Sequence, residues 1–104
     1  MLVLGIDPGT ALTGYGAVRG EPFGSLALVE CGVIRTSARD RLPVRLREIY
    51  DDVRALIERL QPDALAVEDV FYSRNVRTTV VLGHARGVNL LAGEQAHLPV
   101  HEYP

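Results

Sequence analysis

The sequence contains no lysine, so all 11 of its basic residues are arginines. They are outnumbered by 13 acidic residues, which gives a formal net charge of −2. Proteins that bind nucleic acid usually carry a basic excess. The overall charge therefore argues mildly against a nucleic-acid partner, and leaves a local arginine patch as the means by which this chain could hold phosphates.

Cysteine is nearly absent too, since Cys31 is the only one. No intrachain disulfide can form, which fits a reducing compartment, and we expect Cys31 to be a small buried residue of an apolar strand. No apolar run approaches the ~20 residues that a membrane span needs. The start of the chain lacks the basic segment of a secretory signal peptide. Together these absences predict a cytoplasmic protein.

What the chain does have is the length and composition of one globular domain, residues 1–104, with 47% hydrophobic residues. Three stretches near its beginning are short, apolar or β-branched, and separated by Gly- and Pro-containing turns. They are Leu2–Ile6, Thr13–Arg19 and Ser25–Arg35. This pattern predicts three strands in an antiparallel meander.

From Arg41 the apolar spacing becomes helical, with one face formed by Leu42, Leu46, Ile49, Val53, Leu56 and Leu60. Ala64–Glu68 reads as a fourth strand, Asn75–Ala92 as a second helix that is apolar on more than one side, and Leu98–His101 as a fifth strand. The order βββαβαβ predicts an α/β fold, with a mixed five-stranded sheet and flanking helices.

Two carboxylates stand where strands end, Asp7 after the first strand and Glu68 at the end of the fourth. If the helix at 41–60 is a crossover, these strands lie side by side and parallel, and both carboxylates project from the same end of the sheet. Oxygen ligands of this kind suit Mg²⁺. A pair of such ions can promote hydrolysis of a phosphodiester.

Structural explanations compete with this interpretation. Asp7 precedes Pro-Gly and could simply cap a turn. Glu68 is harder to explain in this way, because an unpaired carboxylate is costly to bury. Asp69 should point to the opposite face of the strand, so we expect it to face solvent or a helix and not to be a ligand.

The segment after the second carboxylate combines an aromatic residue, two arginines and an amide: Phe71, Arg74, Asn75 and Arg77. Such a composition is typical of surfaces that stack bases and contact phosphates. Composition alone favours a simpler interpretation, in which Phe71 is a core residue and Ser73 or Asn75 caps the second helix. The pair Gly83 and Gly87 indicates close packing of that helix.

Seven segments spread along the chain are similar to one known family. They are 4–10 (LGIDPGT), 13–17 (TGYGA), 31–36 (CGVIRT), 45–50 (RLREIY), 67–71 (VEDVF), 82–88 (LGHARGV) and 99–103 (PVHEY). The chain thereby resembles the RuvC family of Holliday junction resolvases over essentially its whole length.

The resemblance implies an RNase H-like fold and a homodimer that associates through the helix at 75–92. Asp7 and Glu68 would be catalytic metal ligands, in a site that holds two Mg²⁺ ions in the complete family fold, with Mn²⁺ as an alternative. Phe71 would lie near the centre of a four-way DNA junction, with Arg74, Asn75 and Arg77 also on the DNA side. The implied activity is nicking of such junctions in recombination and DNA repair, alongside the RuvA–RuvB branch-migration complex.

Family members carry further acidic or histidine ligands in helices after the fifth strand, whereas this sequence stops at Pro104. We therefore expect a domain that is incomplete at its C-terminus, inactive alone, and exposed on one apolar face of the sheet. One alternative is a non-catalytic DNA-binding or dimerisation fragment. Another is a phosphate-binding domain of the actin-like ATPase type, whose first phosphate loop is similar to residues 5–10. That class needs a second domain and a second loop, which this sequence does not show.

Overall fold

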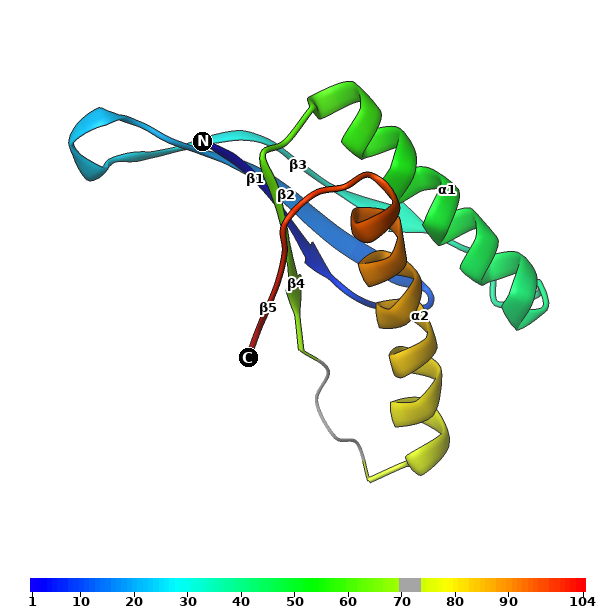
Figure 1. Ribbon diagram of the computed structural model, residues 1–104. Coiled ribbons are helices and arrows are strands. Elements are labelled where there is room, and N and C mark those ends of the chain that lie inside the picture. Colours follow the sequence, from blue (N-terminus) through cyan, green and yellow to red (C-terminus); the bar gives the residue numbers. More distant parts are fainter. Residues whose placement is uncertain (70–73) are drawn as a thin grey trace.

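The computed structural model describes residues 1–69 and 74–104. Within them, five strands form one sheet in the order β3-β2-β1-β4-β5, and both α-helices lie on one side of it (Figure 1). The elements are β1 (Leu2–Asp7), β2 (Leu12–Gly20), a 3-10 turn (Pro22–Gly24), β3 (Leu26–Arg35), α1 (Leu42–Leu60), β4 (Ala64–Glu68), α2 (Val76–Gln95) and β5 (Val100–Tyr103). The expected α/β fold with a mixed sheet is confirmed.

The first three strands form the expected meander. β1 pairs antiparallel with β2, and β2 pairs antiparallel with β3. The second pairing shifts register between Ala17 and Val18, as a β-bulge does, and a bulge bends and twists the strands locally. Beyond it the hairpin extends past the rest of the sheet (Figure 1) and ends in a turn, where Phe23 has a positive φ of 68° and a fully exposed side chain.

Helix α1 is the predicted crossover: it joins β3 to β4, and β4 then lies beside β1 in the sheet. It begins after Arg41, with Pro43 in its first turn, a position that proline tolerates because the helix does not use that N–H. It ends at Leu60, and the next residue, Gln61, has a left-handed backbone and an amide that donates to the Ile57 carbonyl at 2.9 Å. The chain then enters β4, which pairs with β1 in parallel.

Helix α2 begins as the sequence indicated. The side-chain oxygen of Asn75 accepts a hydrogen bond from the Thr78 amide at 3.3 Å, so Asn75 is the N-cap. The helix continues to Gln95, three residues past the predicted end.

The fifth strand lies two residues later than predicted, at Val100–Tyr103 instead of 98–101. The reason is the end of α2. The amides of His97 and Leu98 donate to the carbonyls of Glu94 and Gly93, at 3.0 and 3.1 Å. These bonds satisfy the last helical carbonyls, so His97 and Leu98 belong to the helix end, and pairing with β4 begins with the Pro99 carbonyl, which accepts from the Leu65 amide at 2.9 Å.

The hydrophobic core fills the space between the sheet and the two helices. Its largest fully buried apolar side chains are Leu4, Ile6, Ile49, Val53, Leu65 and Val67. Gly93 of α2 packs directly on the sheet, where an added Cβ would lie 2.6 Å from Leu65 Cδ2 and 2.8 Å from Val100 Cγ2. The absence of a side chain at Gly93 therefore allows α2 to approach β4 and β5 closely.

The opposite face of the sheet is open, as expected, and carries exposed apolar side chains that include Leu12, Leu28 and Val33. The prediction that Cys31 is buried is wrong, because its side chain is exposed. Cys31 stands opposite Gly16 on the outermost strand, and alternation places it on the face that the helices do not cover. No helix in the described parts of the chain is long and apolar enough to cross a membrane.

Candidate active site

Asp7 and Glu68 are the last residues of two neighbouring parallel strands. The register of β1 and β4 ends with Ile6 opposite Val67, so Asp7 and Glu68 stand one step further on. Ile6 and Val67 are fully buried against the helices. Because side chains alternate along a strand, the two carboxylates project from the open face of the sheet. The structure thus brings the two acids together.

A pair of contacts at the other end of these strands fixes the register. The Leu2 amide donates to the Asp63 carboxylate at 2.7 Å, and the Asp63 amide donates to the Leu2 carbonyl at 2.8 Å. Asp63 directly precedes β4. A slip of one residue would turn the Glu68 side chain to the helix face, so this contact keeps both carboxylates on the same face.

The closeness of the two acids raises the pKa of the Glu68 carboxyl above its usual value. The first cause is a hydrogen bond with Asp7, followed by the negative charge of Asp7 and by partial burial. Two carboxylates that share a small space favour keeping one proton between them. A divalent cation can replace that proton, and paired carboxylate oxygens fit a hard cation such as Mg²⁺. The described residues contain no group of three or more His, Cys, Asp or Glu side chains placed to hold a metal ion, so among them Asp7 and Glu68 form a pair without a third member.

Asp7 borders a shallow groove of about 390 Å³ on the sheet. Gly5, Gly14 and Gly16 form much of its lining, with Tyr103 at one side. A Cβ added at Gly16 would meet nothing within 4 Å, so the packing of the chain does not itself require glycine there. The groove therefore has a flat backbone floor next to a carboxylate.

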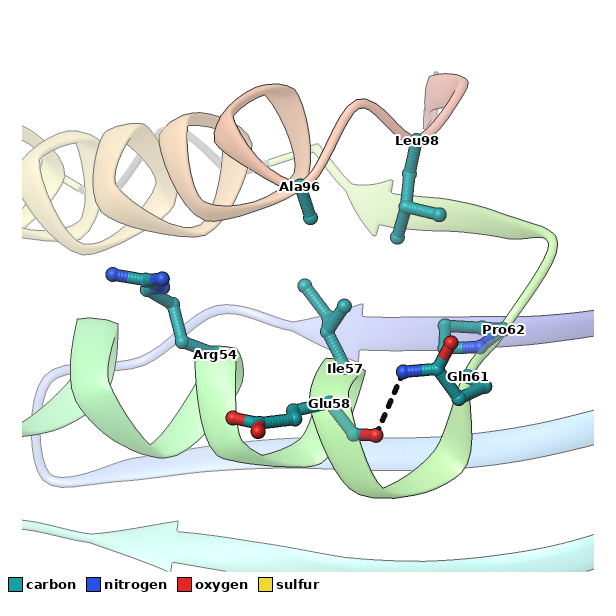
Figure 2. Close-up of a pocket in the computed structure, with 7 residues that line it drawn as sticks. All are labelled: Arg54, Ile57, Glu58, Gln61, Pro62, Ala96 and Leu98. Atoms are coloured by element: carbon teal, nitrogen blue, oxygen red, sulfur yellow. Dashed lines mark hydrogen bonds between the residues drawn. The ribbon is translucent and has the colours of Figure 1, made fainter.

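A second hollow, of about 400 Å³, is shown in Figure 2. It opens between the C-terminal ends of α1 and α2, and its lining includes Ile57, Pro62 and Leu98. Pro62 precedes β4, whereas Glu68 ends it, so this hollow is at the opposite end of the strand. We do not assign it to the active site.

Sequence reasoning missed Tyr103. This residue stands opposite Glu68 in the parallel pairing of β4 and β5 and lines the groove with Asp7. Burial raises the pKa of its hydroxyl, and the negative charges of Glu68 and Asp7 raise it further. A fifth strand that continued to residue 103 would have placed Tyr103 beside Glu68, but the predicted strand ended at His101.

Arg86 of α2 was also missed. Its Nε donates to the main-chain carbonyl of Glu68 at 3.2 Å, and its Nη2 donates to the Glu102 carboxylate. The same Nε lies 3.7 Å from Asp69 Oδ1. Asp69 was expected to face solvent or a helix; its side chain is 63% exposed and also meets Arg86 of α2, so both parts of that expectation are met.

The predicted DNA-contact residues lie on a different part of the chain from the acids. Arg74, Asn75 and Arg77 are exposed at the amino end of α2, where Asn75 also caps the helix. Phe71 and Ser73 lie outside the described residues.

Comparison with known proteins gives one family. Residues 3–104 match the family model described as crossover junction endodeoxyribonuclease RuvC. The RuvC protein of Chloroflexus aggregans is 52% identical over 103 residues, which cover 99% of this chain and 62% of that protein. That of Moorella thermoacetica is 51% identical over 104 residues, covering 99% and 61%. The chain thus spans about three fifths of the length of these relatives.

Solved structures agree with the sequence relatives. Thermus thermophilus RuvC in complex with a Holliday junction substrate matches with a TM-score of 0.91 and 32% identity, over 100% of this chain and 66% of that one. The yeast mitochondrial Holliday junction resolvase Ydc2 matches with a TM-score of 0.71 over 97% of this chain and 49% of that one; at 14% identity this supports the fold alone. These matches confirm the RNase H-like fold, and the chain belongs to the RuvC family.

Proposed function

We propose that this chain is the carboxylate-bearing part of an endonuclease that resolves four-way DNA junctions, with Mg²⁺ as the cofactor, in recombination and repair. The observation that carries the proposal is the meeting of Asp7 and Glu68 at the ends of β1 and β4. Its context is the family match over residues 3–104, and a RuvC protein with 32% identity has been solved with a Holliday junction substrate.

Asp7 and Glu68 are the residues that would hold the divalent ion, Mg²⁺ or Mn²⁺. When bound, such an ion supplies charge stabilisation and an activated water for phosphodiester hydrolysis. The chain's own part is to fix the two carboxylates on one rigid sheet end. The glycine floor beside Asp7 leaves room for a sugar-phosphate backbone to approach them, because Gly14 and Gly16 place no side chain over the groove.

The DNA would be held by the segment between β4 and the first turn of α2. Arg74 and Arg77 are exposed there and supply positive charge for phosphates in a chain of net charge −2. In this proposal Phe71, which lies outside the described residues, contacts the bases, and Asn75 contributes beside its capping role.

Self-association of two chains would use α2. Three large apolar side chains of this helix are exposed, Val76, Val80 and Leu91, and Gly83 and Gly87 have open space around them. A helix that exposes apolar residues gains stability when another surface covers them. The RuvA–RuvB complex is a further proposed partner, which rests on the family resemblance alone.

We also propose that these 104 residues alone cut junctions far more slowly than a complete family protein. Two divalent ions a few ångströms apart repel strongly, and several carboxylates are needed to offset that repulsion. Asp7 and Glu68 supply at most two negative charges. An isolated chain that binds junctions without cutting them would then act as a DNA-binding or dimerisation module.

The test compares this chain with a chimera, in which the remainder of the Chloroflexus aggregans RuvC protein is joined after Pro104. A synthetic four-way junction in Mg²⁺ is the substrate, and linear duplex is the control. We expect cleavage by the chimera and loss of cleavage on Asp7→Asn or Glu68→Gln, with junction binding within about twofold. Asp51→Asn, an exposed acidic residue of α1 paired with Arg47, is the matched control and should cut normally.

Cleavage by the Asp7→Asn chimera at the control rate would show that the carboxylate pair is not the active site. Cleavage by the 104-residue chain as fast as by the chimera would show that two carboxylates suffice.

A further inference from the structure

Arg86 connects α2 to the ends of both strands beside the candidate active site. Its side chain is only 14% exposed, although it lies in the middle of a surface helix. The guanidinium contacts three groups: the Glu68 main-chain carbonyl, the Glu102 carboxylate and the Asp69 carboxylate. Arg86 thus contacts the last residue of β4, the residue that follows it, and a residue of the neighbouring strand β5.

These contacts lie behind the active site. Glu102 stands opposite Val67 in the pairing of β5 with β4, and Val67 is buried against the helices. Glu102 is therefore on the helix face of the sheet, whereas the Glu68 carboxylate is on the open face. Arg86 reaches the Glu68 peptide from the side opposite its carboxylate.

We propose that Arg86 is a positioning residue for Glu68: it holds the end of β4 so that the Glu68 carboxylate meets Asp7. The expected effect of Arg86 on metal binding rests on the proposed function. The positioning of the end of β4 by Arg86 does not depend on it. The pairing of β4 with β1 ends at Val67. Past that point the strand end is paired with β5, where Glu68 stands opposite Tyr103 and the Asp69 amide donates to the Tyr103 carbonyl at 2.6 Å.

The chemistry of arginine suits this role. A guanidinium is always charged and offers several N–H donors in a fixed plane, so it can serve a carbonyl and a carboxylate at once. The ammonium of lysine would keep the charge without that geometry. The two ion pairs of Arg86 add little stability by themselves, because Asp69 and Glu102 are both more than half exposed and exposed ion pairs contribute little to folding. What distinguishes Arg86 is its bond to the backbone of Glu68.

The first measurement uses no metal. Amide hydrogen exchange of Asp69 is compared, in EDTA, between wild type, Arg86→Gln, Arg86→Lys and the control Arg47→Gln, an exposed arginine of α1. Arg86→Gln should exchange at least about tenfold faster at Asp69, while amides in the middle of β1 stay protected. Arg86→Lys should be intermediate, and Arg47→Gln should match wild type.

The second measurement is Mn²⁺ binding followed by electron paramagnetic resonance. Loss of a residue that orients a metal ligand typically weakens metal affinity by about 10–100-fold. Arg86→Gln should therefore weaken Mn²⁺ binding by that factor, while its thermal midpoint changes no more than that of Arg47→Gln. In the chimera, Arg86→Gln should cut slowly at low Mn²⁺ and recover at high Mn²⁺ with junction affinity unchanged. A merely structural defect would not recover with metal.

The outcomes separate the two proposals. If wild type binds no Mn²⁺, or if Asp7→Asn does not reduce binding, the proposed metal site is wrong, and exchange at Asp69 still tests Arg86. If exchange at Asp69 and Mn²⁺ affinity are both unchanged in Arg86→Gln, the positioning role is wrong. Should Arg86→Gln fail to fold, Arg86→Lys provides the same comparison, and wild-type behaviour in it would overturn the need for the guanidinium.

Discussion

The carboxyl groups of Asp7 and Glu68 lie together at the ends of two neighbouring parallel strands, and hydrogen bonding with Asp7 is the first cause of the raised pKa of Glu68. The two groups would repel if both were ionised without a cation nearby. In the metal-free protein, the fold therefore holds together two side chains that repel each other once both have lost their protons.

We predict that Asp7→Asn raises the thermal midpoint of the metal-free protein at pH 7 by a few degrees. A raised pKa means that the folded state holds its proton more tightly than the unfolded chain. Stability from Glu68 is thus lost as the pH rises from its unfolded pKa through its folded one. Asp7→Asn removes the main cause of that loss. Thermal unfolding in EDTA from pH 4 to 8 measures it.

Added Mg²⁺ should reverse the order, because an ion that binds only the folded wild type stabilises it. An Asp7→Asn protein that is less stable than wild type in EDTA at pH 7 would contradict the repulsion argument.

A second prediction concerns Glu30, which accepts two hydrogen bonds from Arg59, at 2.8 and 2.6 Å, and one from the Tyr15 hydroxyl at 2.8 Å. These bonds lower the pKa of Glu30 from 4.5 to about 2. A lowered acid pKa gives stability that is present above pH 4.5 and lost as the pH falls toward 2. Urea unfolding should show a flatter dependence on pH for Glu30→Gln across this window.

The contribution of this pair is small, because Arg59 is more than half exposed. Glu58→Gln is the control, because Glu58 is an exposed residue of α1, the helix that carries Arg59. Its stability should depend on pH as that of the wild type does. Equal slopes for Glu30→Gln and wild type would show that the contacts do not persist in solution.

The third prediction concerns Gly93. A methyl group there would lie 2.6 and 2.8 Å from atoms of Leu65 and Val100, so α2 would have to move away from the sheet. We expect Gly93→Ala to destabilise the protein by about 1–3 kcal/mol in urea unfolding. Gly16→Ala is the control, because the space at that position is open. Equal stability of the two variants would mean that the helix does not pack as described.

The fourth prediction uses the two open glycines of α2. Alanine in a helix is more stable than glycine by about 0.5–1 kcal/mol, and nothing lies within 4 Å of a Cβ at Gly83 or Gly87. The double alanine variant should therefore be more stable as a monomer. If two copies of α2 pack closely, it should also associate more weakly in sedimentation. Unchanged association would argue against α2 as the dimer contact.

Much of the fold could be read from the sequence, because apolar spacing determines both the type of each element and the side it buries. The heptad-like spacing of α1 and the run Ala64–Glu68 matched the observed elements closely. The meeting of Asp7 and Glu68 followed from one further inference, that a crossover helix before β4 lets this strand lie beside β1 and parallel to it. Its role in metal binding stays a prediction.

What the sequence did not show depends on contacts between distant residues. The end of α2 is determined by amides that return to helical carbonyls at His97 and Leu98, so β5 was placed too early and Tyr103 was missed. Arg86 looked like one of many helix arginines, since its partners lie on two strands. Cys31 is apolar in context but stands on an uncovered face.

The contact between Leu2 and Asp63 bears on the order in which the strands pair during synthesis. The meander of β1, β2 and β3 involves neighbouring segments and can form early during synthesis, whereas β4 must wait for the whole of α1. Until Asp63 reaches the amide of Leu2, Asp7 has no acidic neighbour from β4. A nascent chain therefore displays a lone aspartate, and the pair of acids arises only once the strand that follows the crossover has docked.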